Sequence, residues 1–209
     1  MRTQRLAEEL VSLRIRDATR RDSQNRGRLE GEVSYERRRI DQEDFKPFGI
    51  LYDGFGLQSI FSSLISQDER GLDHCHIIFT NQLLGTWDED DHRFHARVSV
   101  YGFPSVISAT GVVEAPAKPR EFYLKRRLGV PLEVLKGEFR GRFIDHEDPR
   151  LTEVIKGYTM QAIFFHMTGD PFCDDPDCRL YNAHWQEELI RAQVGGKYDF
   201  CTNHRRFLS

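Results

Sequence analysis

The chain has no apolar run close to the ~18 residues that are needed to cross a bilayer. Its first residues, MRTQRLAEEL, also lack the apolar core of a secretion signal. Cysteine is scarce: four in 209 residues are too few to suggest a disulfide framework. We therefore expect a soluble, cytoplasmic protein without a membrane partner, whose cysteines bind metal or are buried as thiols.

A strong excess of one charge is also lacking, because the formal net charge is only −3. So small a net charge gives no global reason to expect binding to nucleic acid or to an anionic membrane. The charge is uneven, however, since residues 1–40 contain eleven Arg against seven Asp and Glu. We interpret 1–45 as a basic extension with the first structural elements. Its surface is either a solvated mixture of charges or a contact for an acidic partner.

Apolar residues are sufficient for a core, at 39% of the chain with 15 Phe among them. Short β-branched or alternating stretches predict strands, and partial alternation predicts an edge strand or ribbon near the N-terminus. The predicted strands are 75–80, 94–100 and 105–109, with the edge strand or ribbon at 30–40. The basic segment 116–127 is predicted to be a connection that leads into a short extended piece.

Helical spacing of apolar residues predicts four helices. They are 3–16, 57–65, about 149–168 and 183–193. Pro149 can begin the third helix and Gly169 can end it, while Asn182 is the expected N-cap of the fourth. Strands in the middle followed by a long helix predict a mixed α/β (α+β) domain over 46–209.

Three cysteines and one histidine have the spacing of zinc ligands. Cys173 and Cys178 are followed, after 22 residues, by Cys201 and His204. Zn²⁺ prefers four such ligands in a closed tetrahedron when its role is structural, and the predicted helix between the pairs can bring them together. We therefore predict one structural zinc per chain at 173–204. The alternative is three unrelated thiols and a surface histidine.

The fourth cysteine, Cys75, lies between His74 and His76 in a predicted strand. Neighbours along a strand point to opposite faces, so neither histidine is placed to act as its base. Cys75 is therefore predicted to be a small buried hydrophobe.

Two further clusters have a functional and a plain interpretation. WDEDDHRFH at 87–95 carries carboxylates and imidazoles that suit a metal ion, but such runs are usually solvated turns. The basic segment Lys118–Arg127 contains Phe122 and Tyr123, which suit single-stranded nucleic acid. The acidic balance of the whole chain favours a solvated surface instead.

The run AIFFHMTGDPFCDDPDC, from Ala162 to Cys178, resembles the signature of the archaemetzincins, a branch of the metzincin zinc peptidases. That signature is H-E-x-x-H-x-x-G-x-x-H-C-x4-C-x-M, followed later by a further C-x-x-C. Its histidines bind the catalytic zinc and its Glu is the general base. Here Ala162 replaces the first His, Ile163 the Glu, Phe172 the third His and Leu180 the Met, whereas His166, Gly169, Cys173 and Cys178 match, and Cys201 and His204 take the place of the final pair.

The resemblance extends over about 50–204 and is specific over 162–204. Stretches such as FCDDPDCRLYNAHWQEELI and EAPAKPREFY also resemble an archaeal group of metallopeptidase-like proteins of unassigned function. The resemblance implies a metzincin-like fold with a twisted sheet. It also implies an active-site-type helix at about 149–168 and a C-terminal segment held by the structural zinc.

The departures from the signature determine the functional prediction. A catalytic zinc needs three protein ligands and an open position for water, and only His166 is left. Losing the general base alone typically costs about 10²–10⁴-fold in rate. The sequence favours an inactive metallopeptidase-like protein that keeps a cleft for a peptide or protein partner. Two alternatives stay open: an active metal-dependent hydrolase with a rearranged site, and a nucleic-acid or assembly factor that uses the basic segments.

Overall fold

A computed structural model describes residues 2–21, 27–42 and 49–208. The chain divides into two compact units, Met1–Gly111 (unit 1) and Val112–Ser209 (unit 2). The structure contains helices and two mixed sheets, so the predicted mixed α/β class is confirmed. Among the described residues, no helix has the length and apolar character needed to cross a membrane. The predicted boundary near residue 45 stays a prediction.

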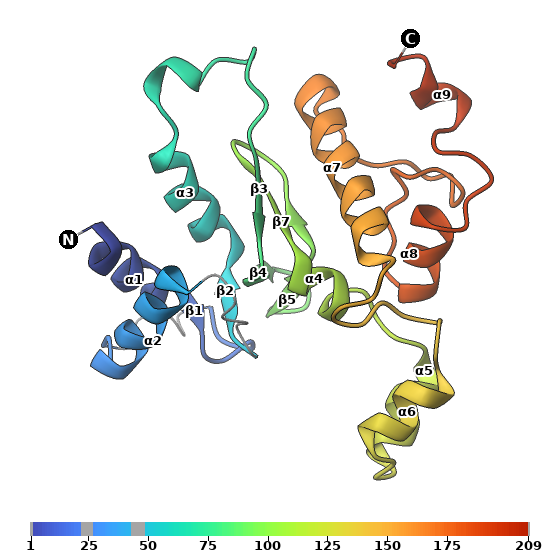
Figure 1. Cartoon of the computed structure of the whole chain (residues 1–209), viewed down its shortest axis with the longest axis horizontal. Coiled ribbons are helices and arrows are strands. Elements are labelled where there is room, and N and C mark those ends of the chain that lie inside the picture. Colours follow the sequence, from blue (N-terminus) through green and yellow to red (C-terminus); the bar gives the residue numbers. More distant parts are fainter. Residues whose placement is uncertain (1, 22–26, 43–48, 209) are drawn as a thin grey trace. The chain divides into compact units, whose positions relative to one another are not determined.

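Unit 1 contains two small sheets (Figure 1). The first has the order β1-β2-β4-β5, formed by Arg14–Ile15, Leu51–Asp53, Leu83–Asp88 and Arg93–Arg97. The second has the order β3-β7-β6, formed by Ile77–Thr80, Ser105–Ser108 and Ser99–Val100. Each sheet has one parallel pair, β2 with β4 and β3 with β7, and its other pairs are antiparallel.

The predicted strands of unit 1 are confirmed with changes at their ends. The predicted strand 94–100 divides at Val98, because β5 belongs to the first sheet and β6 to the second. The strand predicted from Cys75 begins only at Ile77. Cys75 is exposed, so its prediction as a buried hydrophobe is wrong. The pairing with β7 begins at Ile77, opposite Ser105, and His76 contributes its carbonyl, which accepts a hydrogen bond from the Ser105 N–H at 2.9 Å.

Three helices accompany the sheets of unit 1: α1 Arg2–Ser12, α2 Glu30–Asp41 and α3 Gly54–Leu64, with a short 3₁₀ turn, η1, at Gln67–Glu69. Helices 3–16 and 57–65 are thus confirmed as α1 and α3. The edge strand predicted at 30–40 is wrong, because this segment is α2. Val33 and Glu36 are buried and Ile40 packs on the core, which is a helical stripe. Because Glu36 is charged, the apolar residues of this segment did not by themselves show helical spacing.

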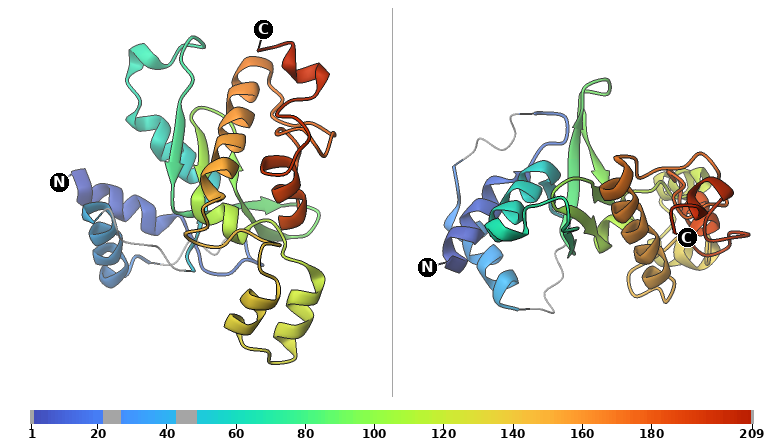
Figure 2. Two further views of the ribbon diagram at one scale, coloured as in Figure 1. Left: turned by 45° about the vertical axis from the view of Figure 1, so that its right-hand side comes forward. Right: turned by 90° about the horizontal axis from the view of Figure 1, so that it is seen from above.

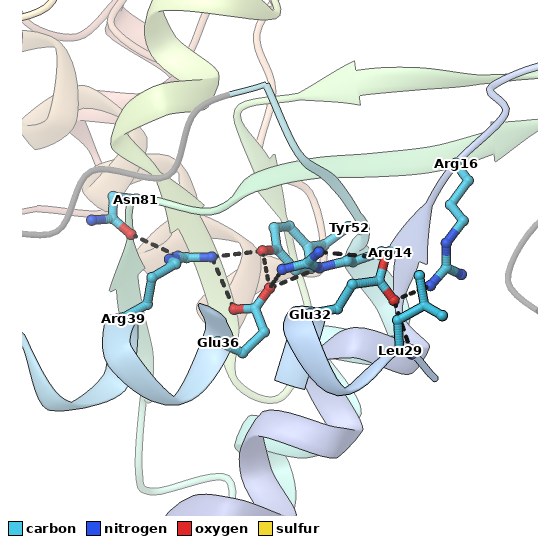
Figure 3. A network of polar contacts seen from close by, with 8 residues as sticks. All are labelled: Arg14, Arg16, Leu29, Glu32, Glu36, Arg39, Tyr52 and Asn81. Carbon is cyan, nitrogen blue, oxygen red and sulfur yellow. Dashed lines mark hydrogen bonds and ion pairs between the residues drawn. The ribbon is translucent and has the colours of Figure 1, made fainter. Parts of the chain in front are cut away.

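Glu36 is the centre of a buried polar network in unit 1 (Figure 3). Its carboxylate accepts a hydrogen bond from Arg14 at 2.6 Å and one from Tyr52 at 2.5 Å, and Arg39 lies 3.1 Å away. Burial of Tyr52 and its contact with Glu36 both raise the pKa of the phenol. Tyr52 also packs in the core with Leu10, Leu57 and Leu84. The network therefore joins β1, α2 and β2 through one carboxylate.

Unit 2 is mostly helical: α5 Arg120–Arg127, α6 Leu132–Glu138, α7 Leu151–Thr168, α8 Gln186–Gln193 and α9 Thr202–Arg205, with α4 Ala109–Glu114 at its start. The connection predicted at 116–127 is wrong for most of its length, since residues 120–127 form α5. Phe122 of this helix packs with Leu135, Phe139 and Phe143. Those contacts lie up to 21 residues away along the chain, so local pattern did not reveal them.

The long helix of unit 2 is confirmed as α7, and it ends at Gly169 in the left-handed conformation (φ +80°). The next helix, α8, begins at Gln186, so the predicted start at Ala183 and the Asn182 cap are wrong. The residue before α8, Trp185, forms a bridge with Ala117, and this pairing keeps the preceding chain extended. Gly157 of α7 leaves room for the Gln193 side chain of α8, because a Cβ there would overlap it.

The Glu36 network makes a prediction about stability. Glu36→Gln leaves the charges of Arg14 and Arg39 without their buried carboxylate, which typically costs about 3–5 kcal/mol. Tyr52→Phe removes two hydrogen bonds with charged groups, the one donated to Glu36 and the one accepted from Arg39, each typically worth about 1.5–3 kcal/mol. The free energy of unfolding, measured by urea titration, checks both values.

Arg5→Ala is the matched control, because it removes an exposed ion pair, with Glu9, that is typically worth about 0–1 kcal/mol. Equal losses for Arg5→Ala and Glu36→Gln would contradict a structural role for the network.

Candidate metal centre

The first pair of ligands lies in a closed loop that follows α7. The backbone N–H of Cys173 donates to the carbonyl of Leu180 at 2.9 Å, and Cys173 forms a bridge with Tyr181. Within the loop, the N–H of Tyr181 donates to the carbonyl of Cys178 at 2.9 Å. The two cysteines of this loop are therefore held on one short turn of chain.

The second pair lies at the start of α9. Cys201 is the residue before the helix, and the backbone N–H of His204 donates to its carbonyl at 3.1 Å. This single helical turn places the Nδ1 atom of His204 3.1 Å from the Sγ atom of Cys201. The C-x-x-H spacing thus brings its two ligand atoms together locally.

The two pairs converge on one point. The Sγ atoms of Cys173 and Cys201 are 3.8 Å apart, and the Sγ atom of Cys178 is 4.0 Å from Nδ1 of His204. All four ligand atoms lie within 4.8 Å of one another. A tetrahedral site with Zn–S bonds of about 2.3 Å has ligand atoms about 3.8 Å apart. The spacing fits a shared metal ion and is far from the ~2.05 Å of a disulfide.

Ion pairs and hydrogen bonds along the connection hold the two pairs together. Arg179 donates to Asp199 at 2.8 Å, Arg191 donates to Asp177 at 2.8 Å, and the Tyr198 hydroxyl donates to Asp175. Each of these interactions joins a residue next to the first pair of ligands to a residue that lies closer along the chain to the second pair. The sequence analysis did not identify these partners, because ordinary surface residues carry no signal for such a role.

Helix α7 supplies the main apolar side chain that packs against the centre. Phe164 is fully buried and packs with Cys178 and Leu180. Its ring lies edge-on to that of His204, with the centroids 5.4 Å apart, and 5.7 Å from that of Phe200. A metal held here would tie the C-terminal residues of unit 2 to the helix predicted as active-site-type.

The ligand thiols differ in acidity. Burial raises the pKa of the Cys173 thiol to about 12, and the neighbouring Cys178 adds to the rise. Burial also raises the pKa of Cys178. For Cys201, burial acts in the same direction, but hydrogen bonds from the His204 backbone and the Cys173 thiol outweigh it and lower the pKa. Cys201 is therefore the thiol that ionises first.

The positions that the resemblance aligns with a catalytic signature do not form a second centre. Ala162 is fully buried on α7, and Phe172 is 38% exposed. Among the described residues, His166 belongs to no group of three ligand-type side chains within metal-binding distance, and neither His146 nor His184 does. The structure therefore brings together the four predicted ligands and leaves His166 apart from them.

A second group of ligand atoms lies in unit 1, at the β4–β5 hairpin. It consists of Asp88, Asp91 and His95, all from the predicted cluster 87–95. The Nε2 atom of His95 lies 2.8 Å from a carboxylate oxygen of Asp91, yet it is closed to solvent and makes no hydrogen bond with a described residue. Backbone N–H groups of Asp91 and Asp90 lower the pKa of Asp88.

A hollow of about 880 Å³ opens beside the four metal ligands in unit 2. The rings of Phe172, Tyr198 and Phe200 line it together with acidic and basic side chains. The charged residues are Asp170, Asp174, Asp175, Arg205 and Arg206. The sequence analysis predicted a cleft but did not identify its lining, because residues 198–206 reach it only through the fold.

Unit 2 thus combines four side chains that could hold a metal ion with a helix that packs against them. A family model described as "Probable metallopeptidase family (DUF6775)" matches residues 1–209, and the chain belongs to this family. This confirms the metallopeptidase-like part of the predicted resemblance. Neither the curated proteins nor the solved structures give a significant match to the chain.

The ligand set makes a prediction for which the fourth cysteine, Cys75, provides the control. Cys173→Ser or Cys201→Ser should lose the bound metal, whereas Cys75→Ser, at an exposed cysteine outside the group, should keep it. A 100-fold loss of metal affinity corresponds to about 2.7 kcal/mol of stability when the metal is saturating. Elemental analysis and thermal unfolding of the three variants check this, and equal metal contents would contradict the assignment.

A second prediction concerns protons. The raised pKa values mean that Cys173 and Cys178 carry their protons at pH 7, and metal binding must release both. Releasing at least these two protons makes the affinity rise by at least about 100-fold per pH unit below the thiol pKa values. Calorimetric titration of zinc into metal-free protein, in two buffers of different ionisation enthalpy, counts the protons. An affinity that does not change between pH 6 and 7 would contradict the thiolate ligands.

Proposed function

We propose that this protein is a cytoplasmic member of the metallopeptidase family that has lost peptidase activity and binds a peptide or a protein segment. One structural zinc, held by Cys173, Cys178, Cys201 and His204, keeps the binding site in shape. The observation that carries this proposal is the separation of His166 from the four converged ligands. The chain has the ligands of a closed structural site, and the positions that the resemblance aligns with the catalytic signature lack those of an open one.

The donor set supports zinc as the metal. Three thiolates and one imidazole match the Cys₃His sites that hold structural Zn²⁺, and soft sulfur ligands do not suit Mg²⁺ or Ca²⁺. Such a site has no position for a catalytic water, because all four places are taken by protein. A reducing cytoplasm would keep these cysteines free to bind the metal.

The archaemetzincin resemblance supports the loss of activity. In that family the first His, the Glu and the third His bind zinc and activate water, and this chain has Ala162, Ile163 and Phe172 in their places. Buried Ala162 and partly exposed Phe172 offer neither a ligand nor a base. Without them His166 has nothing to share a metal with, and water has no group to take its proton.

The hollow beside the zinc ligands suits a peptide. Phe172 and Phe200 offer apolar surface, while Asp174 and Arg205 carry opposite charges at the same site. Binding sites commonly combine an apolar wall with a few polar groups that orient the ligand. Phe172 stands where the resemblance places a catalytic histidine, so the former catalytic position would now contribute contact surface.

One observation favours an alternative, an active hydrolase with a rearranged site. Asp88, Asp91 and His95 supply three ligands and leave coordination positions open, as a catalytic metal requires. The nucleic-acid alternative gains no such support, because Phe122, one of its two predicted stacking rings, is buried in the core of unit 2.

Counting metals separates the two functions. We expect one zinc per chain, unchanged by His166→Ala and by His95→Ala, and no cleavage of a casein substrate with or without added zinc. Two metals per chain, one of them lost in His95→Ala together with a chelator-sensitive cleavage, would contradict the proposal and favour the hydrolase.

Peptide binding is tested on the hollow itself. A pool of fluorescent decapeptides of random sequence, measured by anisotropy, should bind the unchanged protein, and Phe172→Asp should weaken binding at least tenfold. Met167→Asp is the matched control, because Met167 is exposed on α7 and does not line the hollow. Equal binding by both variants, with zinc content unchanged, would contradict a peptide site here.

A further inference from the structure

Helices α5 and α6 form a hairpin within unit 2, side by side in both views (Figures 1 and 2). Phe122 of α5 packs against Leu135 of α6 and against Phe139 and Phe143, which follow it. Gly129 ends α5 in the left-handed conformation (φ +86°). The N–H of Val130 donates to the Lys125 carbonyl at 3.1 Å, which is a Schellman turn. The hairpin therefore has its own core and a defined turn.

The outer surface of this hairpin is apolar around the turn. Leu128, in the turn itself, is 83% exposed, and Leu124 one helical turn earlier is 58% exposed. Leu132 and Val134 at the start of α6 are exposed as well. A single exposed leucine is ordinary, but four aliphatic side chains within eleven residues indicate an interaction surface.

The same surface carries unpaired positive charge. Residues 118–142 contain eight Lys and Arg against three Glu, in a chain whose net charge is −3. Lys125, Lys136 and Arg142 make ion pairs. Four exposed arginines pair with no acid among the residues that the structure describes: Arg120, Arg126, Arg127 and Arg140. We call Leu124, Arg126, Arg127, Leu128 and Leu132 the basic tip.

Unit 1 contains a surface with the opposite charge and the same apolar character. It is segment 64–73, which leaves the end of α3 and includes η1 (Figure 1). Leu72 is 92% exposed and Leu64 is 62% exposed. Asp68, Glu69 and Asp73 are exposed too.

The acids of this segment lack cationic partners. Glu69 and Asp73 lie near only histidines, at 3.8 Å and 3.3 Å, and no described Lys or Arg pairs with any of the three acids. Arg70 lies among them but donates to the carbonyls of Ile65 and Ser62 at the end of α3. We call residues 64–73 the acidic segment.

We propose that the basic tip of one copy of this chain binds the acidic segment of a second copy. Charge complementarity supports it, because each surface has unpaired charge of the sign that the other needs. The exposed leucines on both sides supply apolar area to bury. Nucleic acid would pair with the arginines but would leave the leucines in water. This interface is independent of the zinc centre and of the proposed function.

The contact joins two different surfaces, so symmetry has consequences. Two copies that exchange the contact reciprocally form a closed dimer with two equal interfaces, whereas a single contact per pair leaves free surfaces and continues into a chain of copies. Because it depends on arginines and carboxylates at an exposed surface, the association weakens as salt is added.

Sedimentation velocity of the full zinc-loaded chain, over a concentration series at 50 mM and 500 mM salt, tests this. We expect self-association at low salt with a dissociation constant at least tenfold weaker at high salt. Arg126→Glu with Arg127→Glu should weaken it at least tenfold, and so should Leu128→Ser alone. Arg37→Glu with Arg38→Glu is the matched control, since it makes the same charge change on exposed arginines of α2 and should leave association unchanged.

Exchanging the charges of the acidic segment and the basic tip gives the most decisive test of this contact. Asp68→Arg with Glu69→Arg should abolish self-association on its own, and mixing it with the Arg126→Glu, Arg127→Glu variant should restore a mixed complex. Circular dichroism confirms that each variant is folded. A protein that stays monomeric at all concentrations, or loses association equally in the α2 control, overturns the proposal. Binding of the monomer to vesicles of phosphatidylcholine and phosphatidylserine through the basic tip would also overturn it, and would assign that surface to a membrane.

Discussion

The constraint on which unit 2 depends is the convergence of two ligand pairs that are separated by 22 residues. Cys173 and Cys178 are held by one closed loop, and Cys201 and His204 by one turn of helix. Neither pair can satisfy a metal alone, so the connection between them must fold back on itself. The ion pairs of Arg179 and the contacts of Phe164 achieve this without the metal, and the metal would then close the arrangement.

Unit 1 is organised by a different interaction, a carboxylate on the buried side of helix α2. Glu36 is fully buried, and two arginines and Tyr52 surround it. Such a cluster is stable only while it is complete, since any member left alone would be a buried charge. The network therefore fixes the positions of β1, α2 and β2 relative to one another. Apolar packing alone would tolerate small shifts between these elements.

The Cys₃His group and the isolated position of His166 bear on function in different ways. Family membership and the Cys₃His group connect the chain with metallopeptidase-like proteins and with a candidate metal site, whereas the separation of His166 from that group supports our proposal of lost activity. Under this proposal, a protein without the chemistry would keep a metal that shapes its C-terminal part. The hollow beside that metal, lined by Phe172 and Phe200, is where we place this function.

The sequence by itself determined the features that depend on local pattern. The α7 helix with its Gly169 cap, the helices α1 and α3, and the ligand spacing of 173–204 could all be predicted, because each is set by residues a few positions apart. Only the tertiary structure decided the rest. Helix α2 needed Tyr52 and Arg14 to bury Glu36, α5 needed distant phenylalanines, and Cys75 was exposed although an apolar strand follows it closely. Burial is a property of the whole unit, so it cannot be read from a short stretch of chain.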